Sequence, residues 1–148
     1  MVQWLVEQGA DKENGDNNWN GMTPLIGAAI NGHLEIVQYL MELGVDKEKA
    51  DMYGTTPLIG AAAKGRLEVV QWLVEQGADK EKADRNGSTP LHMAAQEGHA
   101  IVVVCLLSHG AKLNVRDKAG KLPVDVATTE EIKQIIRDEQ KRRRDLTV

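Results

Sequence analysis

The sequence predicts an all-α solenoid in which short units of two helices stack side by side. Four prolines, Pro24, Pro57, Pro90 and Pro123, stand 33 residues apart, and a glycine lies three residues before each of them. Two further series of glycines keep the same interval. Aromatic residues make up only 3% of the chain and Phe is absent, so the core must be built from aliphatic side chains in thin layers. A fixed period of this length is typical of repeats that bury their apolar sides only against one another.

Residues 51–83 form the clearest unit, and its first half predicts a turn followed by a short helix. Gly54 is expected in the turn, because a positive φ is easily adopted only by glycine. Thr56 is expected as the N-cap and Pro57 as the first helical residue, a pair that favours helix initiation. Alanines follow on one face of this helix, where they let a neighbouring backbone come close.

The second half of the unit predicts another helix and a loop. Gly65 is expected to end the first helix, and apolar residues from Leu67 to Val74 recur at helical spacing. Gly77 is expected at the C′ position of this second helix, where a left-handed residue is favoured. The chain then runs extended toward the next turn. Each unit is therefore predicted to contain a turn, a helix, a turn, a helix and a loop.

The motif DRNGSTPLHMAA at residues 84–95 resembles the ankyrin repeat, whose pattern is Asp-x-x-Gly-x-Thr-Pro-Leu-His-x-Ala-Ala. The resemblance covers essentially the entire chain and continues in this repeat with Gly98-His99, Ile101-Val102 and Leu106-Leu107. It implies that adjacent repeats stack side by side and that β-hairpin loops project from one edge. It also implies that the first helices line a concave face that binds a protein partner.

The chain departs from this pattern at two kinds of position. Ile26-Gly27 and Ile59-Gly60 stand where the family usually has His-x. Lys12, Lys47 and Lys80 replace the usual Val before the hairpin, so these strands are expected to be more solvated than the pattern. Acidic residues alternate with lysine there in DKEK strings, which we interpret as a solvated, self-neutralising strand.

The repeat spacing divides a single ankyrin-repeat domain, residues 1–148, into successive units. The predicted units are a partial N-terminal repeat at 1–17 (second helix and long hairpin), repeats at 18–50, 51–83 and 84–116, a C-terminal capping repeat at 117–140 and a basic tail at 141–148. Residues 1–9 correspond to a second helix without its first helix, so their apolar side chains have no upstream partner. This predicts either an excised part of a longer array or self-association through the uncapped N-terminal helix.

The C-terminal unit is expected to close the stack. Thr129 is expected to cap a last helix whose apolar face holds Ile132, Ile135 and Ile136. The basic run from Lys141 to Arg144 is interpreted as a solvated end after this helix. A nuclear-import or phosphate-contacting cluster is the alternative.

By the resemblance, side chains on the hairpin tips and first helices face a protein partner. Apolar and aromatic residues there, with polar neighbours, have the composition of an interface centre and its rim. The alternative is that Trp19 and Tyr53 lie across neighbouring hairpins and serve packing. The predicted protein-binding residues are Trp19, Met22, Ile30, Met52 and Tyr53, continued by Lys64, Arg85, Asn86, Gln96, Glu97 and Lys118.

A second set of residues, Trp4, Tyr39, Trp72 and Cys105, occupies one repeat position in the second helices. We interpret this stripe as packing between successive second helices, with a binding ladder on the outer face as the alternative. Cys105 is then a small buried hydrophobe and not a reactive thiol. His92 occupies the position whose histidine in this family usually bonds across to a neighbouring loop, so a structural role is expected.

Composition and motifs disfavour several classes of function. A net charge of −4 gives no general reason to bind nucleic acid, and a single cysteine makes neither an internal disulfide nor a zinc site. The longest apolar run, residues 100–107, is far shorter than the ~20 residues that span a bilayer. No phosphate-binding loop or nucleophile motif is present. We therefore expect no catalysis, cofactor, metal or small-molecule substrate, and a cytoplasmic or nuclear location.

The function favoured by the sequence is a non-catalytic scaffold that binds a protein through its concave face and hairpin tips. Three alternatives stay open: a structural spacer segment of a longer ankyrin array, a substrate-recruiting module of a larger enzyme, and an engineered binder. The sequence does not identify the partner.

Overall fold

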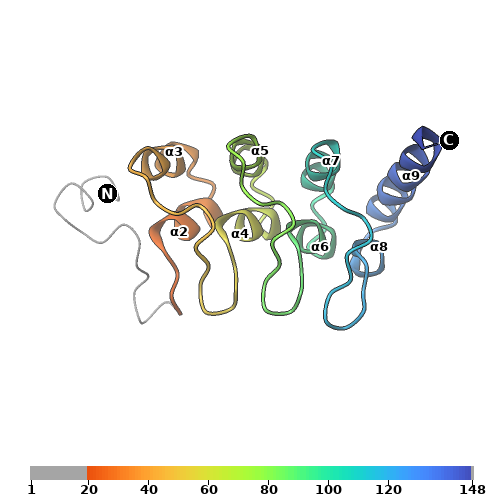
Figure 1. Ribbon diagram of the computed structural model, residues 1–148, viewed down its shortest axis with the longest axis horizontal. Helices are drawn as coiled ribbons and strands as arrows, with labels where there is room; N and C mark the ends of the chain where they lie inside the picture. The colour runs from red at the N-terminus through yellow and green to blue at the C-terminus, as the bar shows by residue number, and fades with distance from the viewer. Residues whose placement is uncertain (1–19, 148) are drawn as a thin grey trace.

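A computed structural model describes residues 20–147 of the chain. Figure 1 shows these residues as two rows of helices, with loops that project from the side of the first helices. This arrangement confirms the predicted all-α solenoid of helix-turn-helix units. The first helices are α2 (Pro24–Ile30), α4 (Pro57–Ala63), α6 (Pro90–Gln96) and α8 (Pro123–Val126). The second helices are α3 (Leu34–Glu42), α5 (Leu67–Glu75), α7 (Ala100–Ser108) and α9 (Glu130–Leu146).

The predicted helix starts are confirmed. Thr23, Thr56 and Thr89 are the N-caps of α2, α4 and α6, and each is followed by a proline as the first helical residue. Each threonine hydroxyl accepts the N–H of the third residue beyond it, at 3.2, 3.2 and 3.3 Å. These bonds satisfy a donor that the first helical turn leaves without an internal partner. Gly54 has the expected positive φ, 79°.

The predicted helix end at Gly77 is confirmed as well. Gly77 has a φ of 86° and donates its N–H to the Val74 carbonyl, while Ala78 donates to the Leu73 carbonyl, both at 3.0 Å. This pair of bonds is the Schellman arrangement, which satisfies the last carbonyls of a helix. The chain can therefore leave α5 sharply and enter the projecting loop.

The projecting loops differ from the predicted β-hairpins, because residues 20–147 contain no strand. An aspartate closes each loop instead. The Asp51 carboxylate accepts the N–H groups of Tyr53 and Thr55, both at 2.9 Å, and the Asp51 N–H bonds to the Thr55 carbonyl at 3.1 Å. Asp84 and Asp117 make the corresponding bonds one and two repeats later. We call these segments hairpin loops below, for their shape.

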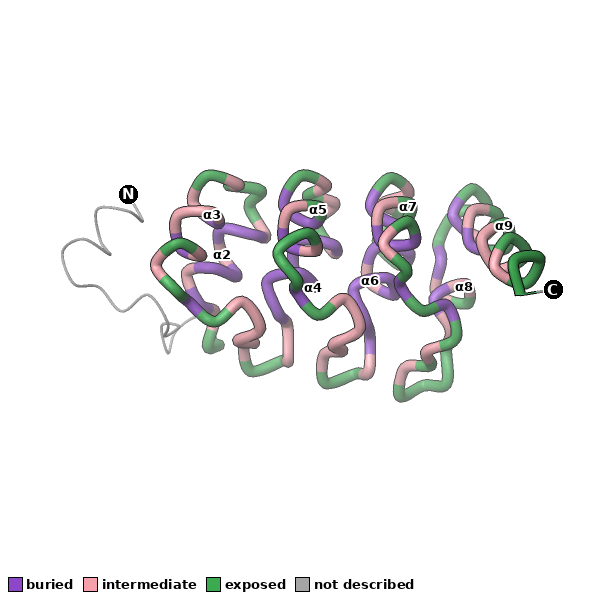
Figure 2. Tube along the Cα trace, turned by 45° about the horizontal axis from the view of Figure 1, so that its top comes forward, coloured by how far each residue is buried: buried purple, intermediate pink, exposed green. Residues whose placement is uncertain are grey.

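The core lies between the two rows of helices. Figure 2 shows buried residues where the rows meet and exposed residues at the hairpin tips and outer turns. Leu25, Leu58 and Leu91 occupy the same position in successive repeats, and each is 1% exposed. Ala61 and Ala62 are fully buried, and their small side chains let the first helices pack closely. The first helices pack more tightly on one another than the second helices do, so the stack curves toward the first helices.

Side chains at the start of the second helices connect each repeat to the preceding one. Arg66 donates Nε–H to the Ile30 carbonyl at the end of α2, at 2.8 Å. One repeat later, His99 Nε2 lies 2.9 Å from the Ala63 carbonyl at the end of α4. A carbonyl oxygen only accepts, so Nε2 of His99 carries the proton. Each bond satisfies a helix-terminal carbonyl that has no partner within its own helix.

His92 has the expected structural role. It is 1% exposed, and its Nε2 lies 2.9 Å from the Lys121 carbonyl in the next hairpin loop. Its Nδ1 accepts the Thr89 N–H at 3.2 Å, so Nε2 is the protonated nitrogen and donates to Lys121. The neutral ring therefore joins a helix start to the following repeat.

The DKEK strings are less solvated than predicted in the described repeats, and they form no strand there. Lys47 and Lys80 are half-buried. The Glu48 carboxylate accepts the Asp79 N–H at 2.9 Å, and the corresponding Glu81 accepts the Lys112 N–H at 3.0 Å. Each glutamate thus bonds the backbone of the next repeat, because the repeat spacing places that N–H opposite its carboxylate.

The sequence predicts that the capping repeat ends at residue 140 and that a tail follows. In the structure, α9 continues through this point to Leu146. Thr129 caps α9 as expected, and Ile132 and Ile136 are fully buried. Arg143 holds the second half of the helix in place. Its guanidinium donates to the Ala111 carbonyl at 2.8 Å and to the Leu107 carbonyl at 3.2 Å. Part of the basic run is therefore structural.

Candidate protein-binding surface

The hairpin tips carry five exposed residues of the predicted binding surface. Met52 is 46% exposed and Tyr53 is 55% exposed at the tip between α3 and α4. Arg85 and Asn86 are exposed at the next tip, and Lys118 is exposed at the third. Two apolar side chains at one tip are therefore followed along the stack by cationic and polar ones.

Backbone hydrogen bonds hold these tips next to one another. Met52 donates its N–H to the Asn20 carbonyl at 2.9 Å, Arg85 donates to the Tyr53 carbonyl at 3.0 Å, and Lys118 donates to the Asn86 carbonyl at 2.9 Å. The bonds use equivalent positions in each repeat and involve no side chain. The structure therefore brings Tyr53 next to Arg85, and Asn86 next to Lys118. Main-chain hydrogen bonds hold these residues together, so their side chains are not needed for the contact.

Gly54 allows this close approach. A Cβ added to Gly54 would lie 2.8 Å from the Arg85 nitrogen, and the φ of 79° already disfavours any residue with a side chain. The glycine series thus serves both the turn and the contact between adjacent loops.

The remaining predicted residues lie at the ends of the first helices. Lys64 is the C-cap of α4, Gln96 ends α6 and Glu97 is its C-cap, and all three are exposed. No hydrogen bond or ion pair joins these three side chains to the hairpin tips described above. They form a second row of exposed polar residues, parallel to the tips.

Two predicted residues are only half-buried and take part in internal packing. Ile30 lies over Gly60 of the next first helix, and the Met22 sulfur lies 3.8 Å from where a Gly27 Cβ would be. Each still offers part of its side chain to solvent. Trp19, the first residue of the predicted patch, lies outside the described residues, so the packing alternative for Trp19 is not tested there.

The stripe on the second helices fits packing. Trp72 and Cys105 are half-buried and pack against the hydrophobic core, and Tyr39 is half-buried at the equivalent position. Trp4 lies outside the described residues. Burial, followed by the charge of Glu75, raises the pKa of the Cys105 thiol. A raised pKa disfavours the thiolate, in agreement with the predicted unreactive role.

Residues 20–147 bring together no group of three or more His, Cys, Asp or Glu side chains that would hold a metal ion. No helix in the same range is long and apolar enough to cross a bilayer.

Two models of known protein families match the sequence of this chain. A family model described as ankyrin repeats in three copies matches residues 1–84, and an ankyrin-repeat model matches residues 86–118. The chain belongs to the ankyrin-repeat family. No curated protein matches the chain. The family models end at residue 118, so they do not cover the C-terminal unit with α8 and α9, which the repeat spacing predicts and the structure describes.

Alignment of the ankyrin repeats reveals exposed residues that the sequence predictions missed. Ile101 and Val104 on α7 are 67% and 49% exposed. The equivalent positions hold Glu35 and Gln38 in α3, and Glu68 and Gln71 in α5. The signal was present in the printed sequence, since two apolar residues replace Glu and Gln at a fixed repeat position.

Proposed function

We propose that this chain is a non-catalytic protein-binding module whose partner contacts the hairpin tips and the first helices. Ankyrin repeats generally mediate protein–protein interaction. The observation that carries the proposal here is the exposure of Met52 and Tyr53, 46% and 55%, on a tip that is hydrogen-bonded to both adjacent loops. Neither side chain is needed for those bonds.

The physical basis of binding is that a rigid tip presents an apolar and aromatic pair. Aromatic residues and methionine are enriched in the centres of interfaces, where their burial supplies most of the affinity. A fixed backbone loses little conformational entropy when the partner binds. Arg85, Asn86 and Lys118 provide polar and cationic neighbours of the kind found at an interface rim.

The other residues of the proposed surface extend it along the stack. Lys64, Gln96 and Glu97 offer exposed polar contacts at the ends of the first helices, and Met22 and Ile30 offer partial apolar surface. Trp19 belongs to the proposal by its sequence position beside the first tip. In this arrangement the partner spans several repeats, and its apolar contacts are concentrated toward the N-terminal side.

The double substitution Met52→Lys and Tyr53→Ala tests the proposal. It gives this tip the residues Lys118 and Ala119 that the third tip has at the same positions, so the fold is expected to tolerate it. The free energy of unfolding in urea should stay within about 0.5 kcal/mol of the parent value. Proteins captured by the parent chain from a lysate, and identified by mass spectrometry, should be lost from the variant.

A control variant separates this surface from the rest of the molecule. Gln71 is exposed on α5, in the row of second helices, and Gln71→Ala should leave capture unchanged. If the Met52→Lys, Tyr53→Ala variant captures the same proteins as the parent chain, the proposed surface is wrong. If it loses stability and keeps binding, the two side chains serve packing.

A further inference from the structure

The second helices carry an apolar surface that the proposed hairpin-tip interface does not use. α7 has an apolar residue at every position except Ser108, and Ile101 and Val104 are 67% and 49% exposed. A helix that is apolar on all sides is normally buried on all sides. The equivalent positions of α3 and α5 hold Glu and Gln, so the repeat architecture itself does not require apolar residues there.

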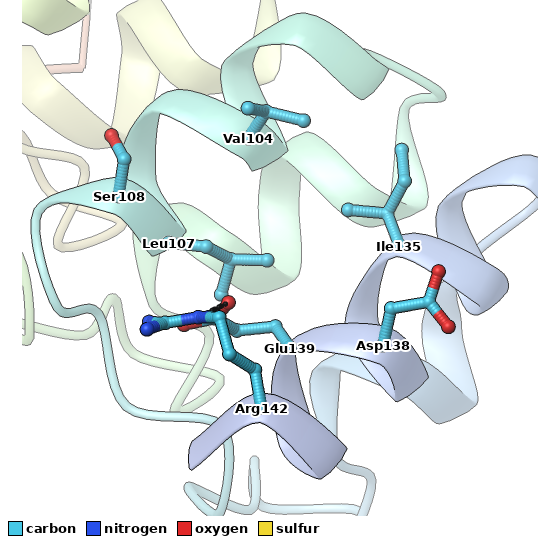
Figure 3. A pocket seen from close by; sticks show the side chains of 7 residues that line it. All are labelled: Val104, Leu107, Ser108, Ile135, Asp138, Glu139 and Arg142. Atoms are coloured by element: carbon cyan, nitrogen blue, oxygen red, sulfur yellow. Dashed lines mark hydrogen bonds and ion pairs between the residues drawn. The ribbon is translucent and has the colours of Figure 1, made fainter. Parts of the chain in front are cut away.

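These residues lie beside a groove between α7 and α9. Figure 3 shows Val104 and Leu107 from α7 and Ile135 from α9 at this groove. The volume of the groove is about 530 Å³. Ser108, Asp138, Glu139 and Arg142 form its polar border. Ile101 precedes Val104 by three residues, so both lie on the same face of α7.

The charged side chains on the groove side carry a net negative charge. Asp138, Glu139 and Arg142 line the groove, and the exposed Glu131 lies on the same face of α9, one turn before Ile135. The α9 cations Lys133 and Arg137 line a different pocket, with Lys121 and Asp125. The neighbouring second helix α5 contains Glu68 and Glu75 and no lysine or arginine. Among the residues that line the groove, Arg142 carries the one positive charge, and it pairs with Glu139 at 2.6 Å.

We propose that the groove between α7 and α9 binds an amphipathic helix of a protein partner, with apolar residues on one face and lysine or arginine on its flanks. The facing helices α7 and α9 form a trough whose apolar floor suits helical anchors at i, i+3 and i+4. The acidic surroundings favour cationic flanks and disfavour acidic ones. This site lies in the row of second helices, so it is separate from the hairpin tips and does not depend on the function proposed for them.

The double substitution Ile101→Glu and Val104→Gln is the matched test, because it gives α7 the residues that α5 has at these positions. The probe is a synthetic helical peptide with leucine at i, i+3, i+4 and i+7 and lysine at its other positions. A second peptide has the same leucines with glutamate in place of lysine. Binding is measured by fluorescence anisotropy, and circular dichroism checks that the variant keeps its helix content.

The parent chain should bind the lysine peptide, and the double variant should lose about tenfold or more in affinity. The glutamate peptide should bind neither protein. The variant adds one negative charge, so nonspecific attraction of the lysine peptide would strengthen its binding to the variant. Groove binding and nonspecific attraction therefore predict opposite changes. The Met52→Lys, Tyr53→Ala variant should bind the lysine peptide as the parent chain does.

Four outcomes would overturn the proposal. They are no binding of the lysine peptide to the parent chain, equal or tighter binding by the Ile101→Glu, Val104→Gln variant, comparable binding of the glutamate peptide, and a dimer of the parent chain in sedimentation equilibrium that this variant abolishes. The last result would show that a second copy of the chain covers the groove.

Discussion

Ile30 packs directly against Gly60, with its Cγ1 2.8 Å from the position that a Cβ on Gly60 would occupy. Ile30 ends α2 and Gly60 lies in the middle of α4, so the contact joins two successive first helices. The corresponding positions one repeat later hold Ala63 and Met93, in which the small residue comes first. Between α2 and α4 the first helix supplies the large residue and the second the small one, whereas between α4 and α6 this order is reversed. A glycine at position 60 therefore leaves room for Ile30.

Gly60→Ala is expected to destabilise the protein, although alanine is the better helix former. The added Cβ would overlap Ile30 in a closely packed interface, where overpacking costs about 1–3 kcal/mol. Gly27→Ala is the matched control, because the nearest atom to its added Cβ is the Met22 sulfur at an ordinary 3.8 Å. That variant should gain about 0.5–1 kcal/mol from helix propensity. Urea unfolding measures both, and the same sign for the two changes would contradict the proposed packing.

Arg143→Ala is expected to destabilise the C-terminal unit. The guanidinium donates to two carbonyls at and beyond the end of α7, and hydrogen bonds from a charged group contribute about 1.5–3 kcal/mol. The control is Arg144→Ala, because Arg144 is exposed and its side chain makes no ion pair within residues 20–147. The control should change the free energy of unfolding by less than about 0.5 kcal/mol. Equal effects of the two substitutions would show that Arg143 does not anchor α9.

The Glu139 carboxylate should make stability depend on acid pH. Its hydrogen bond from Arg142, opposed by burial and supported by Arg143, lowers the pKa from 4.5 to about 2. A carboxyl group with a lowered pKa in the folded state stabilises above its unfolded pKa. This contribution is fully present above pH 4.5 and is lost as the pH falls toward about 2. Glu139→Gln should therefore be less stable than the parent at neutral pH, and the difference should shrink over this range. Urea titrations at several pH values measure it, and a constant difference would contradict the assignment.

His92→Ala should cost more stability than His92→Ile. The alanine leaves a cavity and removes both hydrogen bonds of the ring, the one to the Lys121 carbonyl and the one from the Thr89 N–H, for about 4 kcal/mol in total. Isoleucine fills the space, as Ile26 and Ile59 do at the equivalent positions, and loses only the two hydrogen bonds, about 2 kcal/mol. Thermal or urea unfolding distinguishes the two. An equal loss of unfolding free energy in the two variants would contradict a separate contribution from the packing of the His92 ring.

Much of the fold could be predicted from the sequence because its signals are local. Thr56 caps a helix and Gly77 ends one through backbone chemistry that depends on a few neighbouring residues, and the 33-residue spacing repeats these signals. The missed features are contacts between residues about one repeat apart. The bond from Glu81 to the Lys112 N–H and the anchoring of α9 by Arg143 depend on distances that no local pattern gives.

The candidate binding surface could be predicted only as a set of positions. The family resemblance places Tyr53 and Arg85 on hairpin tips, and both are exposed there. It does not tell how far a half-buried residue such as Ile30 is used in packing, since that depends on Gly60 in the next repeat. Ile101 and Val104 were missed because apolar residues in a second helix are expected to be buried in the core. Their exposure is indicated only by the Glu and Gln residues at the equivalent positions of the other repeats.

The backbone bonds between adjacent hairpin loops also determine how this array can diversify. Since Met52, Arg85 and Lys118 donate main-chain N–H groups, these bonds do not depend on which side chain stands at each position. Neighbouring helices lie about 8–10 Å apart and an extended chain rises about 3.3 Å per residue, so under the proposed function an extended segment of a partner would face a new tip about every third residue. Under that proposal, substitutions at the tips would change which partner is bound, while the spacing between the contacts would stay constant.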